Sequence, residues 1–342
     1  MARTTVYNDK LVTEEKWSKV NPKNKDLLAE FLDYCRAADK SPATRYQYEQ
    51  QLKIFFCYLE ERCDNKFFVD LKKRDLIKFS LYLQSELKVS SSRVSTLRSV
   101  ISSMSAYIEK VLDDEYPNFR NISSVIEISN REPVREKTIM TQEEMQSCLD
   151  VLVAQKKYQI ACYFALLVSS GMRKSEAIQM KVSFFAEKNK VMKGMFYLTP
   201  KIRTKGKGEK GKLLNKYIIV KLFQPYLDLW LNERKEKGIQ SEYLFVTYKD
   251  GDYIPAAVST VNSWANKIGS ITNLDYYNHS SRHFFTTYMK DHGFSDSKIQ
   301  SLVGWASLDM VRRYDDHTSE QELEAAIGEF EAVFGVEDQK DD

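Results

Sequence analysis

Apolar residues recur with helical spacing through the first third of the chain. The pattern predicts helices over residues 23–38, 42–62, 72–87 and 93–112. The dipeptide Ser41-Pro42 suits the start of the second helix, because serine is a favoured N-cap and proline is tolerated in the first turn. The buried stripe of this helix would comprise Tyr48, Leu52, Phe55, Phe56 and Leu59. Together these helices predict a compact all-helical domain.

The second part of the chain mixes helical and alternating patterns. A capping box begins at Thr141 and marks the start of a new helix. Further helices are expected over residues 160–170, 222–237 and 256–268, and strands over residues 195–198, 217–220 and 244–246. The first two strands would be joined by a long basic hairpin. We therefore expect a mostly helical second domain with a small antiparallel sheet.

These patterns divide the chain into five parts. The expected divisions are a flexible arm over residues 1–20, a helical domain over 21–115, a linker over 116–133, a second domain over 134–318 and an acidic tail over 319–342. The tail contains an amphipathic pattern from residue 322 to residue 334, which predicts a helix that docks either on its own domain or on a neighbouring copy.

Composition narrows the class of protein. The chain has 342 residues, of which 43% are hydrophobic, and no apolar run approaches the length that crosses a bilayer. We therefore expect a cytoplasmic protein that does not bind membranes. Its five cysteines are odd in number and lack the spacing of metal ligands, so we interpret them as reduced thiols and expect no metal site.

Charge is distributed unevenly although the net charge is only +3. Seven basic residues lie between positions 201 and 216 against one acidic residue, whereas nine acidic residues lie between 319 and 342 against one lysine. The helix predicted over 93–112 also carries hydroxyl and basic side chains, and its candidates for contact with a phosphate backbone are Ser91, Ser92, Arg93 and Arg98. Taken by itself, that pattern favours an ordinary solvated face over a site of phosphate contact.

The segment from residue 278 to residue 318 gathers the most unusual polar chemistry. It contains His279, Arg282, His283, Trp305 and Tyr314 between two short helical patterns. Such spacing can bring side chains from several helix ends to one pocket. Arginine matches phosphate oxygens, and a phenolate can attack phosphorus, so the segment favours a phosphate site with a covalent nucleophile.

Two further motifs lie upstream of this segment, and the order and spacing of all the motifs can be read along the chain. Gly171-Met172-Arg173-Lys174-Ser175-Glu176 comes first, the basic hairpin with Lys205 follows, and His279-Ser280-Ser281-Arg282, Gly304-Trp305 and Tyr314 come last. The separations are three residues from His279 to Arg282, 23 from Arg282 to Trp305 and nine from Trp305 to Tyr314. In this order and spacing the sequence resembles the tyrosine recombinase (phage integrase) family over roughly residues 20 to 320.

The resemblance implies a fold and a set of roles. It implies the DNA breaking-rejoining fold, mainly α, with a helical core-binding domain and a mostly helical catalytic domain that has a small antiparallel sheet. The implied catalytic residues are Arg173, Lys205, His279, Arg282, Trp305 and Tyr314, with Glu176, Lys207 and His283 in support and Arg203, Lys210 and Lys212 on DNA. Lys207 and Lys210 stay open as alternatives to Lys205. Trp305 stands where the family more often has histidine.

The resemblance also implies partners and a reaction. The partner would be double-stranded DNA with an inverted-repeat core site, bound by a monomer or dimer on one site and by a homotetramer during strand exchange, with room for accessory DNA-bending or directionality proteins. No cofactor is implied, and the protein would lie with the bacterial nucleoid. Strands would be cleaved and rejoined through a 3′-phosphotyrosyl intermediate and a Holliday junction, either to integrate and excise a mobile element or to resolve DNA dimers. A non-cleaving DNA-binding or accessory module on the same fold is the alternative.

Overall fold

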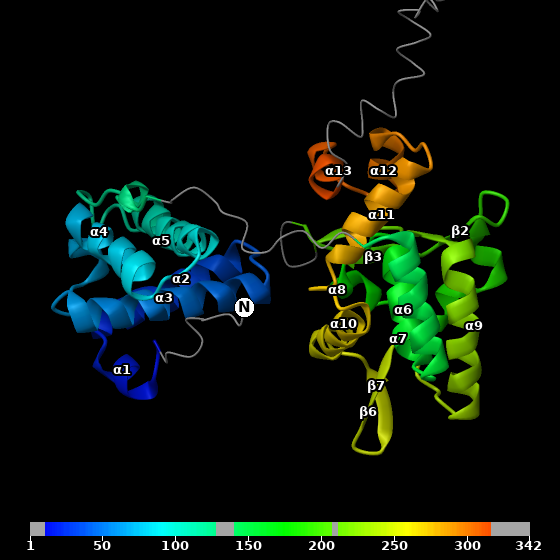
Figure 1. Ribbon diagram of the computed structural model, residues 1–342. Helices are drawn as coiled ribbons and strands as arrows, with labels where there is room; N and C mark the ends of the chain where they lie inside the picture. The colour runs from blue at the N-terminus through cyan, green and yellow to red at the C-terminus, as the bar shows by residue number, and fades with distance from the viewer. Residues whose placement is uncertain (1–10, 128–139, 207–210, 316–342) are drawn as a thin grey trace, which may run out of the picture. The chain divides into compact units, whose positions relative to one another are not determined.

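The computed structural model describes residues 11–127, 140–206 and 211–315. The contacts divide the chain into two compact units, with the boundary along the chain at residues 136 and 137. Figure 1 shows the first unit in blue to cyan and the second in green to orange. As the sequence predicts, the protein is mainly α-helical with small antiparallel sheets.

The first unit consists of helices. They are α1 (Glu14–Lys19), α2 (Pro22–Ala37), α3 (Pro42–Arg62), α4 (Lys73–Leu81), which continues as a π-helical turn over Tyr82–Glu86, and α5 (Ser91–Val111), with short 3₁₀ turns at Phe68–Asp70 and Ser123–Val125. The predicted start of α3 is confirmed, since the hydroxyl of Ser41 accepts a hydrogen bond from the backbone N–H of Thr44 at 3.2 Å. The side chains of Phe55, Phe56, Phe68 and Phe79 are buried among these helices and form its aromatic centre.

Two expectations for the first unit were too simple. Residues 1–10 lie outside the described residues, but the expected arm does not extend to residue 20, because Thr13 caps α1 and Trp17 packs against the core. The expected linker is also wrong in its first half. Ile126 is buried, and Tyr116, Phe119 and Ile122 pack against the same core. Apolar side chains at irregular spacing therefore hold residues 116–126 on the first unit.

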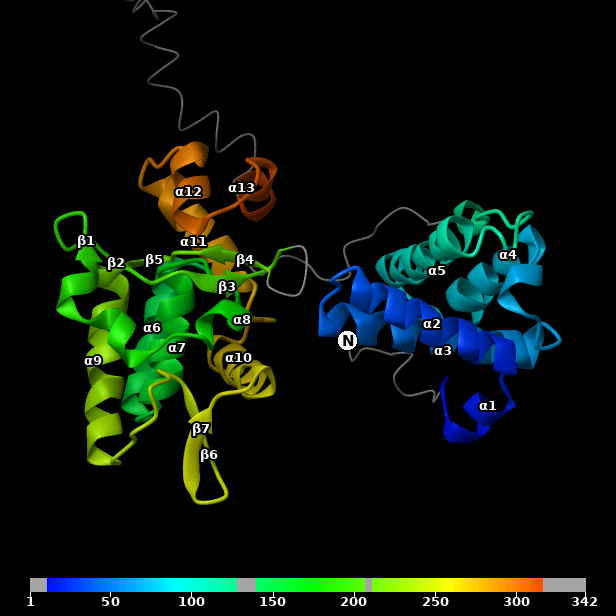
Figure 2. The same ribbon diagram turned by 180° about the vertical axis from the view of Figure 1, so that it is seen from behind.

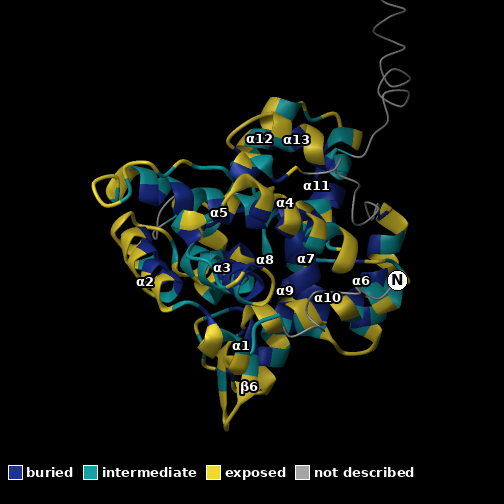
Figure 3. Cartoon of the chain, turned by 90° about the vertical axis from the view of Figure 1, so that its left-hand side faces the viewer, coloured by how far each residue is buried: buried dark blue, intermediate teal, exposed yellow. Residues whose placement is uncertain are grey.

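Helices also dominate the second unit. They are α6 (Gln142–Ala154), α7 (Tyr158–Val168), α8 (Lys174–Ala177), α9 (Val220–Glu236), α10 (Val258–Thr272), α11 (Ser280–Asp291), α12 (Asp296–Val303) and α13 (Asp309–Tyr314). The capping box at Thr141 is confirmed at the start of α6, where Thr141 and Glu144 exchange hydrogen bonds. Every residue of α7 from Ala161 to Val168 is buried, so this helix lies at the centre of the unit (Figure 3).

In the described part of the chain, three small antiparallel sheets accompany these helices. Strands β1 (Lys190–Val191), β2 (Phe196–Leu198) and β5 (Tyr217–Ile219) form one sheet, β3 (Ile202–Thr204) and β4 (Lys212–Leu214) form a second, and β6 (Val246–Lys249) and β7 (Asp252–Pro255) form a third. The predicted pairing of the segments near residues 196 and 218 is confirmed by the register Tyr197 opposite Ile218. The strand expected over 244–246 begins instead at Val246, because Leu244 and Phe245 are core residues before the hairpin. Figure 2 shows β3 and β4 beside α8 and α11.

Gly171 brings the end of α7 close to α11. Its φ is +57°, and a Cβ atom there would lie 2.8 Å from Cδ1 of Phe285 on α11. A side chain at this position would therefore be strained and would also collide with Phe285. The glycine allows the chain to turn sharply and places Arg173, two residues later, beside the helix that carries Arg282.

Candidate active site

Arg173 stands at the N-terminus of α8 and is held by Glu176. Its guanidinium Nη1 lies 2.9 Å from Oε1 of Glu176, and its backbone N–H donates to Oε2 of the same carboxylate at 3.0 Å. Glu176 is completely buried, whereas the side chain of Arg173 is 24% exposed. The buried carboxylate therefore orients Arg173 and leaves part of the guanidinium accessible.

Arg282 on α11 is a fully buried arginine whose guanidinium lacks a hydrogen-bond partner. None of its three guanidinium nitrogens is bonded to a group in the described part of the protein. Its Cζ atom lies 5.1 Å from the ring centre of Trp305 and 5.3 Å from that of Tyr314, where cation–π attraction offsets some of the cost of burial. Burial and the nearby Arg173 lower the pKa of Arg282 to about 10, so the group is still charged at neutral pH. A buried unpaired cation with five donors is a strong site for an anion.

Trp305 adds a second unpartnered donor. Its indole Nε1 is buried without a hydrogen-bond partner among the described residues, and its ring stacks on Tyr314 with centres 5.2 Å apart and planes 20° apart. Gly304 precedes it at φ +77°, a left-handed conformation that ends α12. The turn therefore directs the indole toward the tyrosine and the buried arginine.

Tyr314 is the last residue of α13, and its hydroxyl is hydrogen-bonded to His279. Its hydroxyl lies 2.9 Å from Nε2 of His279, at the start of α11. Burial, followed by the charges of Arg282 and Arg173, lowers the pKa of His279 to about 4. The imidazole is consequently neutral at physiological pH, and its Nε2 can accept the phenolic proton.

Neighbouring side chains fix the position of His279. The hydroxyl of Tyr163 on the buried α7 donates to Oδ1 of Asn278 at 2.9 Å, and Nδ2 of Asn278 donates to the carbonyl oxygen of Val261 at 3.3 Å. His283, one turn after His279, is buried with its ring centre 5.0 Å from that of Tyr314. The start of α11 is thus anchored to the core rather than to a mobile loop.

The structure therefore places five of the six predicted catalytic residues in two linked groups. Tyr314 contacts His279, Arg282 and Trp305, and Arg282 also contacts Trp305. The charge of Arg173 lowers the pKa of both Arg282 and His279. Lys205 follows β3 and is exposed, and its amine makes no hydrogen bond or ion pair within the described residues. Arg203 and Lys212 are exposed on β3 and β4, while Lys207 and Lys210 lie outside the described residues.

One residue at this site was missed by sequence reasoning. Lys216 is buried, with its Nζ 3.1 Å from Oε2 of Glu176 and 3.2 Å from the carbonyl oxygen of Val303. In the sequence it is one of seven basic residues in a hairpin, and only the strand pattern that begins at Tyr217 indicates that it faces the interior.

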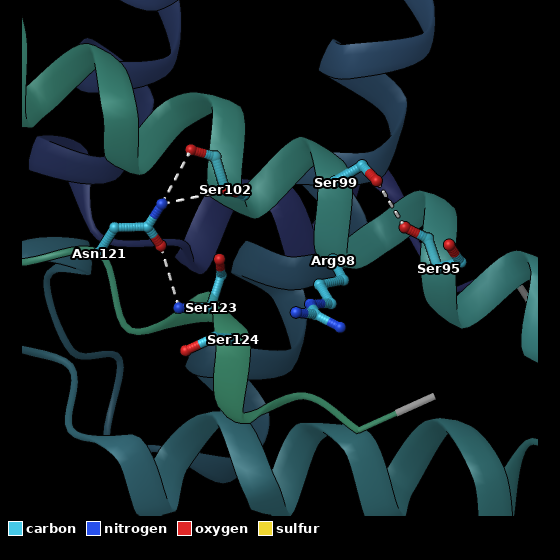
Figure 4. Close-up of a pocket in the computed structure, with 7 residues that line it drawn as sticks. All are labelled: Ser95, Arg98, Ser99, Ser102, Asn121, Ser123 and Ser124. Atoms are coloured by element: carbon cyan, nitrogen blue, oxygen red, sulfur yellow. Dashed lines mark hydrogen bonds between the residues drawn. The ribbon is translucent and has the colours of Figure 1, made fainter. Parts of the chain in front are cut away.

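A second polar surface lies on the first unit. A hollow of about 540 Å³ between α5 and the segment after it is lined by Ser95, Arg98, Ser99, Ser102, Asn121, Ser123 and Ser124 (Figure 4). Asn121 holds the two walls together, since its Nδ2 donates to the hydroxyl of Ser102 at 3.1 Å and its Oδ1 accepts from the backbone N–H of Ser123. Of the four predicted phosphate contacts on this unit, Arg98 lies in the hollow, and Ser91, Ser92 and Arg93 lie in the first turn of α5.

Two further observations concern cofactors and membranes. In the described residues no group of three or more His, Cys, Asp or Glu side chains is placed to hold a metal ion. All five cysteines are buried and free of disulfides. No helix within residues 11–127, 140–206 or 211–315 is long and apolar enough to cross a bilayer.

Comparison with known proteins assigns the family. Residues 138–321 match the phage integrase family, and residues 27–118 match the N-terminal SAM-like domain of phage integrases. The SPbeta prophage-derived recombinase-like protein YomM of Bacillus subtilis (strain 168) is 32% identical over 259 residues, which cover 75% of this chain and 73% of YomM. Tyrosine recombinase XerA of Pyrococcus horikoshii is 26% identical over 305 residues, covering 88% of this chain and 93% of its own.

Solved structures agree on the fold. The XerH site-specific recombinase bound to its palindromic difH substrate superposes with a TM-score of 0.61 at 18% identity, covering 90% of this chain and 97% of that one. The Tn1549 transposon integrase in complex with circular intermediate DNA superposes with a TM-score of 0.61 at 17% identity, covering 88% of this chain and 98% of that one. The chain belongs to the phage integrase family of tyrosine recombinases, a family that cleaves and rejoins DNA.

Proposed function

We propose that this protein is a site-specific recombinase that exchanges DNA strands through covalent attachment of Tyr314. The observation that carries the proposal is a pair of buried donors, Arg282 and Trp305, that have no hydrogen-bond partner among the described residues. Both lie against a tyrosine that is hydrogen-bonded to a neutral histidine. An anion with several oxygens and an electrophilic centre satisfies both donors and gives the tyrosine a target. A DNA phosphodiester has this chemistry.

The two arginines would bind the non-bridging oxygens of the scissile phosphate. Charge grows on these oxygens as a fifth oxygen approaches phosphorus, so donors that are fixed before the reaction stabilise the transition state more than the ground state. Arg282 is fixed by burial and Arg173 by its bonds to Glu176. The indole N–H of Trp305 would complete the set of donors around the phosphate.

Tyr314 would form the new bond. Its phenolic oxygen attacks phosphorus while His279 takes the phenolic proton, and the bond from phosphorus to the 5′ oxygen breaks. A lysine of the basic hairpin, for which we propose Lys205 with Lys207 as the alternative, gives a proton to that oxygen. The products are a 3′-phosphotyrosyl linkage and a 5′-hydroxyl. Attack by the 5′-hydroxyl of another strand reverses the same steps and rejoins the DNA.

Strand exchange requires more than one active site. We propose an inverted-repeat core site in double-stranded DNA that is bound by two copies, and a homotetramer that pairs two such sites and passes through a Holliday junction. The first unit would contact the DNA backbone through Arg98 and the hydroxyl-lined hollow, and the hairpin through Arg203 and Lys212. The XerH recombinase bound to its difH substrate and the Tn1549 integrase in complex with circular intermediate DNA, which share the fold, support the proposal of DNA as the partner.

The biological role would be integration and excision of a mobile element or resolution of DNA dimers, in the bacterial nucleoid. A prophage-derived relative favours the mobile element, and Xer relatives favour resolution. The predicted amphipathic tail helix, which would dock in cis or in trans, lies outside the described residues.

The test is to incubate the purified protein with sheared host DNA, trap covalent adducts with denaturant, and sequence the attached DNA. We expect one recurrent site with inverted repeats, and no adduct with Tyr314→Phe. Specific binding at a recurrent site without adducts from the wild type would instead establish a non-cleaving binding module.

A further inference from the structure

We propose that Lys216 is a positioning residue that fixes the two halves of the active site relative to each other. The proposal rests on the recombinase function proposed above and adds a residue to it. Lys216 contacts Glu176, which holds Arg173, and the carbonyl oxygen of Val303, which precedes Gly304 and Trp305. A single ammonium group therefore joins the segment that carries one phosphate-binding arginine to the turn that carries the indole.

The first contact sets the charge of Glu176. That carboxylate is buried between two cations, Arg173 at 2.9 Å and Lys216 at 3.1 Å. Burial alone would raise the pKa of Glu176, but the charge of Lys216 and the bonds from Arg173 lower it below the ordinary value, so the carboxylate is ionised. Without Lys216, the buried carboxylate of Glu176 would have the partly exposed Arg173 as its remaining cationic partner. It would then attract the Arg173 guanidinium more strongly and draw it away from a phosphate.

The second contact sets the end of α12. The last carbonyl groups of a helix lack intrahelical partners, and the ammonium of Lys216 satisfies that of Val303. Leu214 supports the same turn, since a Cβ atom on Gly304 would lie 2.9 Å from its Cδ1. The returning limb of the basic hairpin thus packs directly on the turn that places Trp305 over Tyr314.

Lys216 is itself fixed at the base of the hairpin. Its backbone N–H donates to the hydroxyl of Thr199 at 2.9 Å, and its carbonyl accepts from the backbone N–H of Thr199 at 3.0 Å. This pairing lies between the sheet of β2 and β5 and the sheet of β3 and β4. Lys216 therefore lies at the base of the strand pair formed by β3 and β4, and it joins this base to the groups proposed to bind phosphate.

The test compares Lys216→Met with Lys221→Met, an exposed lysine on α9 that serves as the matched control. Single-turnover cleavage would be measured on a nicked substrate that carries the recovered site. We expect Lys216→Met to cleave about 10- to 100-fold more slowly, since small misplacements cost this much, with DNA affinity within about twofold of the wild type. The control should cleave like the wild type.

Two readouts separate positioning from a general loss of structure. Hydrogen exchange at the backbone N–H groups of Gly304 and Trp305, both bonded to the carbonyl of Gln300, should accelerate in Lys216→Met while exchange in α7 does not change. On a methylphosphonate substrate, which lacks one charged oxygen, the loss caused by Lys216→Met should shrink as that of Arg173→Ala does. Equal losses on both substrates with unchanged exchange would overturn the proposal.

A second variant guards against misfolding. Lys216→Gln keeps a donor for Val303 without a buried charge, and we expect it to recover part of the cleavage rate. If Lys216→Met does not fold, wild-type cleavage by Lys216→Gln would overturn the proposal, and a slowed rate with accelerated exchange at Gly304 would support it. Failure of the wild type to form any Tyr314-dependent adduct would instead contradict the proposed recombinase function.

Discussion

The hydroxyl of Tyr314 lies 2.9 Å from Nε2 of His279. The histidine is held neutral by burial and by two arginines, so it can accept the phenolic proton as soon as a phosphate arrives. The proposed nucleophile and its proposed base are therefore hydrogen-bonded to each other, whereas the buried donors of Arg282 and Trp305 have no hydrogen-bond partner among the described residues. This arrangement leads to five predictions.

Arg282→Met should stabilise the free protein while abolishing cleavage. The guanidinium is fully buried and unpartnered in the described structure, so the folded state carries the cost of its desolvation, and methionine fills similar space without charge. We expect the free energy of unfolding to rise by about 1–3 kcal/mol in urea titrations. Sulfate should stabilise the wild type more than the variant. A variant less stable than the wild type in sulfate-free buffer would show that Arg282 is structural.

The stability of the protein should fall between pH 6.5 and pH 4 because of His279. Its pKa is about 4 in the folded state against 6.5 ordinarily, so the unfolded chain binds more protons in this window. The contribution is present above pH 6.5 and is lost as the pH falls through 4. After allowance for partial exposure, we expect a loss on the order of 1 kcal/mol between pH 7 and pH 5.

This difference in the free energy of unfolding between pH 7 and pH 5 should disappear in His279→Gln. It should persist in His292→Gln, which changes an exposed histidine. Urea denaturation at both pH values measures it. If the free energy of unfolding changes equally with pH in the wild type and in His279→Gln, other groups cause the loss of stability.

Lys205→Ala should slow cleavage of ordinary DNA by about 10²- to 10⁴-fold, the usual contribution of a general acid. A substrate with sulfur in place of the 5′ bridging oxygen should restore the rate, because a thiolate leaves without a proton. The same pair of substrates with Lys207→Ala distinguishes the two candidates. Rescue of Lys207→Ala alone would transfer the role to Lys207.

Lys290→Met should also slow cleavage, by roughly tenfold. Lys290 on α11 bridges Oδ1 of Asp296 at 2.9 Å and Oδ2 of Asp315, the residue after Tyr314, at 2.8 Å. These bonds raise the pKa of Lys290 well above its ordinary value, and they hold the end of α13 on α11. Lys298→Met, an exposed lysine on α12, is the control. Equal cleavage rates for Lys290→Met and the wild type would show that packing alone positions Tyr314.

Much of the fold could be predicted from local patterns, because caps and apolar stripes are local. The start of α3 at Ser41 and of α6 at Thr141 follow from single residues and their neighbours. Packing decided the remainder. Phe119 and Ile126 lie in a stretch whose prolines and charges indicate a linker, yet their apolar side chains pack against the core of the first unit.

The order of motifs likewise predicted which side chains would meet, but not how. The resemblance to the tyrosine recombinase family implies that Tyr314 lies near His279 and Arg282. In the structure Tyr314 contacts both residues. Only the alternating pattern that begins at Tyr217 indicates that Lys216 faces the interior, and nothing in the sequence indicates which groups it contacts. That burial depends on Glu176 and on Val303, which is 87 residues further along the chain, and no local pattern contains either relationship.

The most direct measurement is to digest the trapped adduct and find which peptide carries the DNA. We predict a nucleotide phosphate on Tyr314 in the wild type, a free 5′-hydroxyl on the released strand, and no adduct with Tyr314→Phe. Attachment through another side chain such as Tyr288, a 5′-linked adduct, or an adduct that persists in Tyr314→Phe would contradict the account.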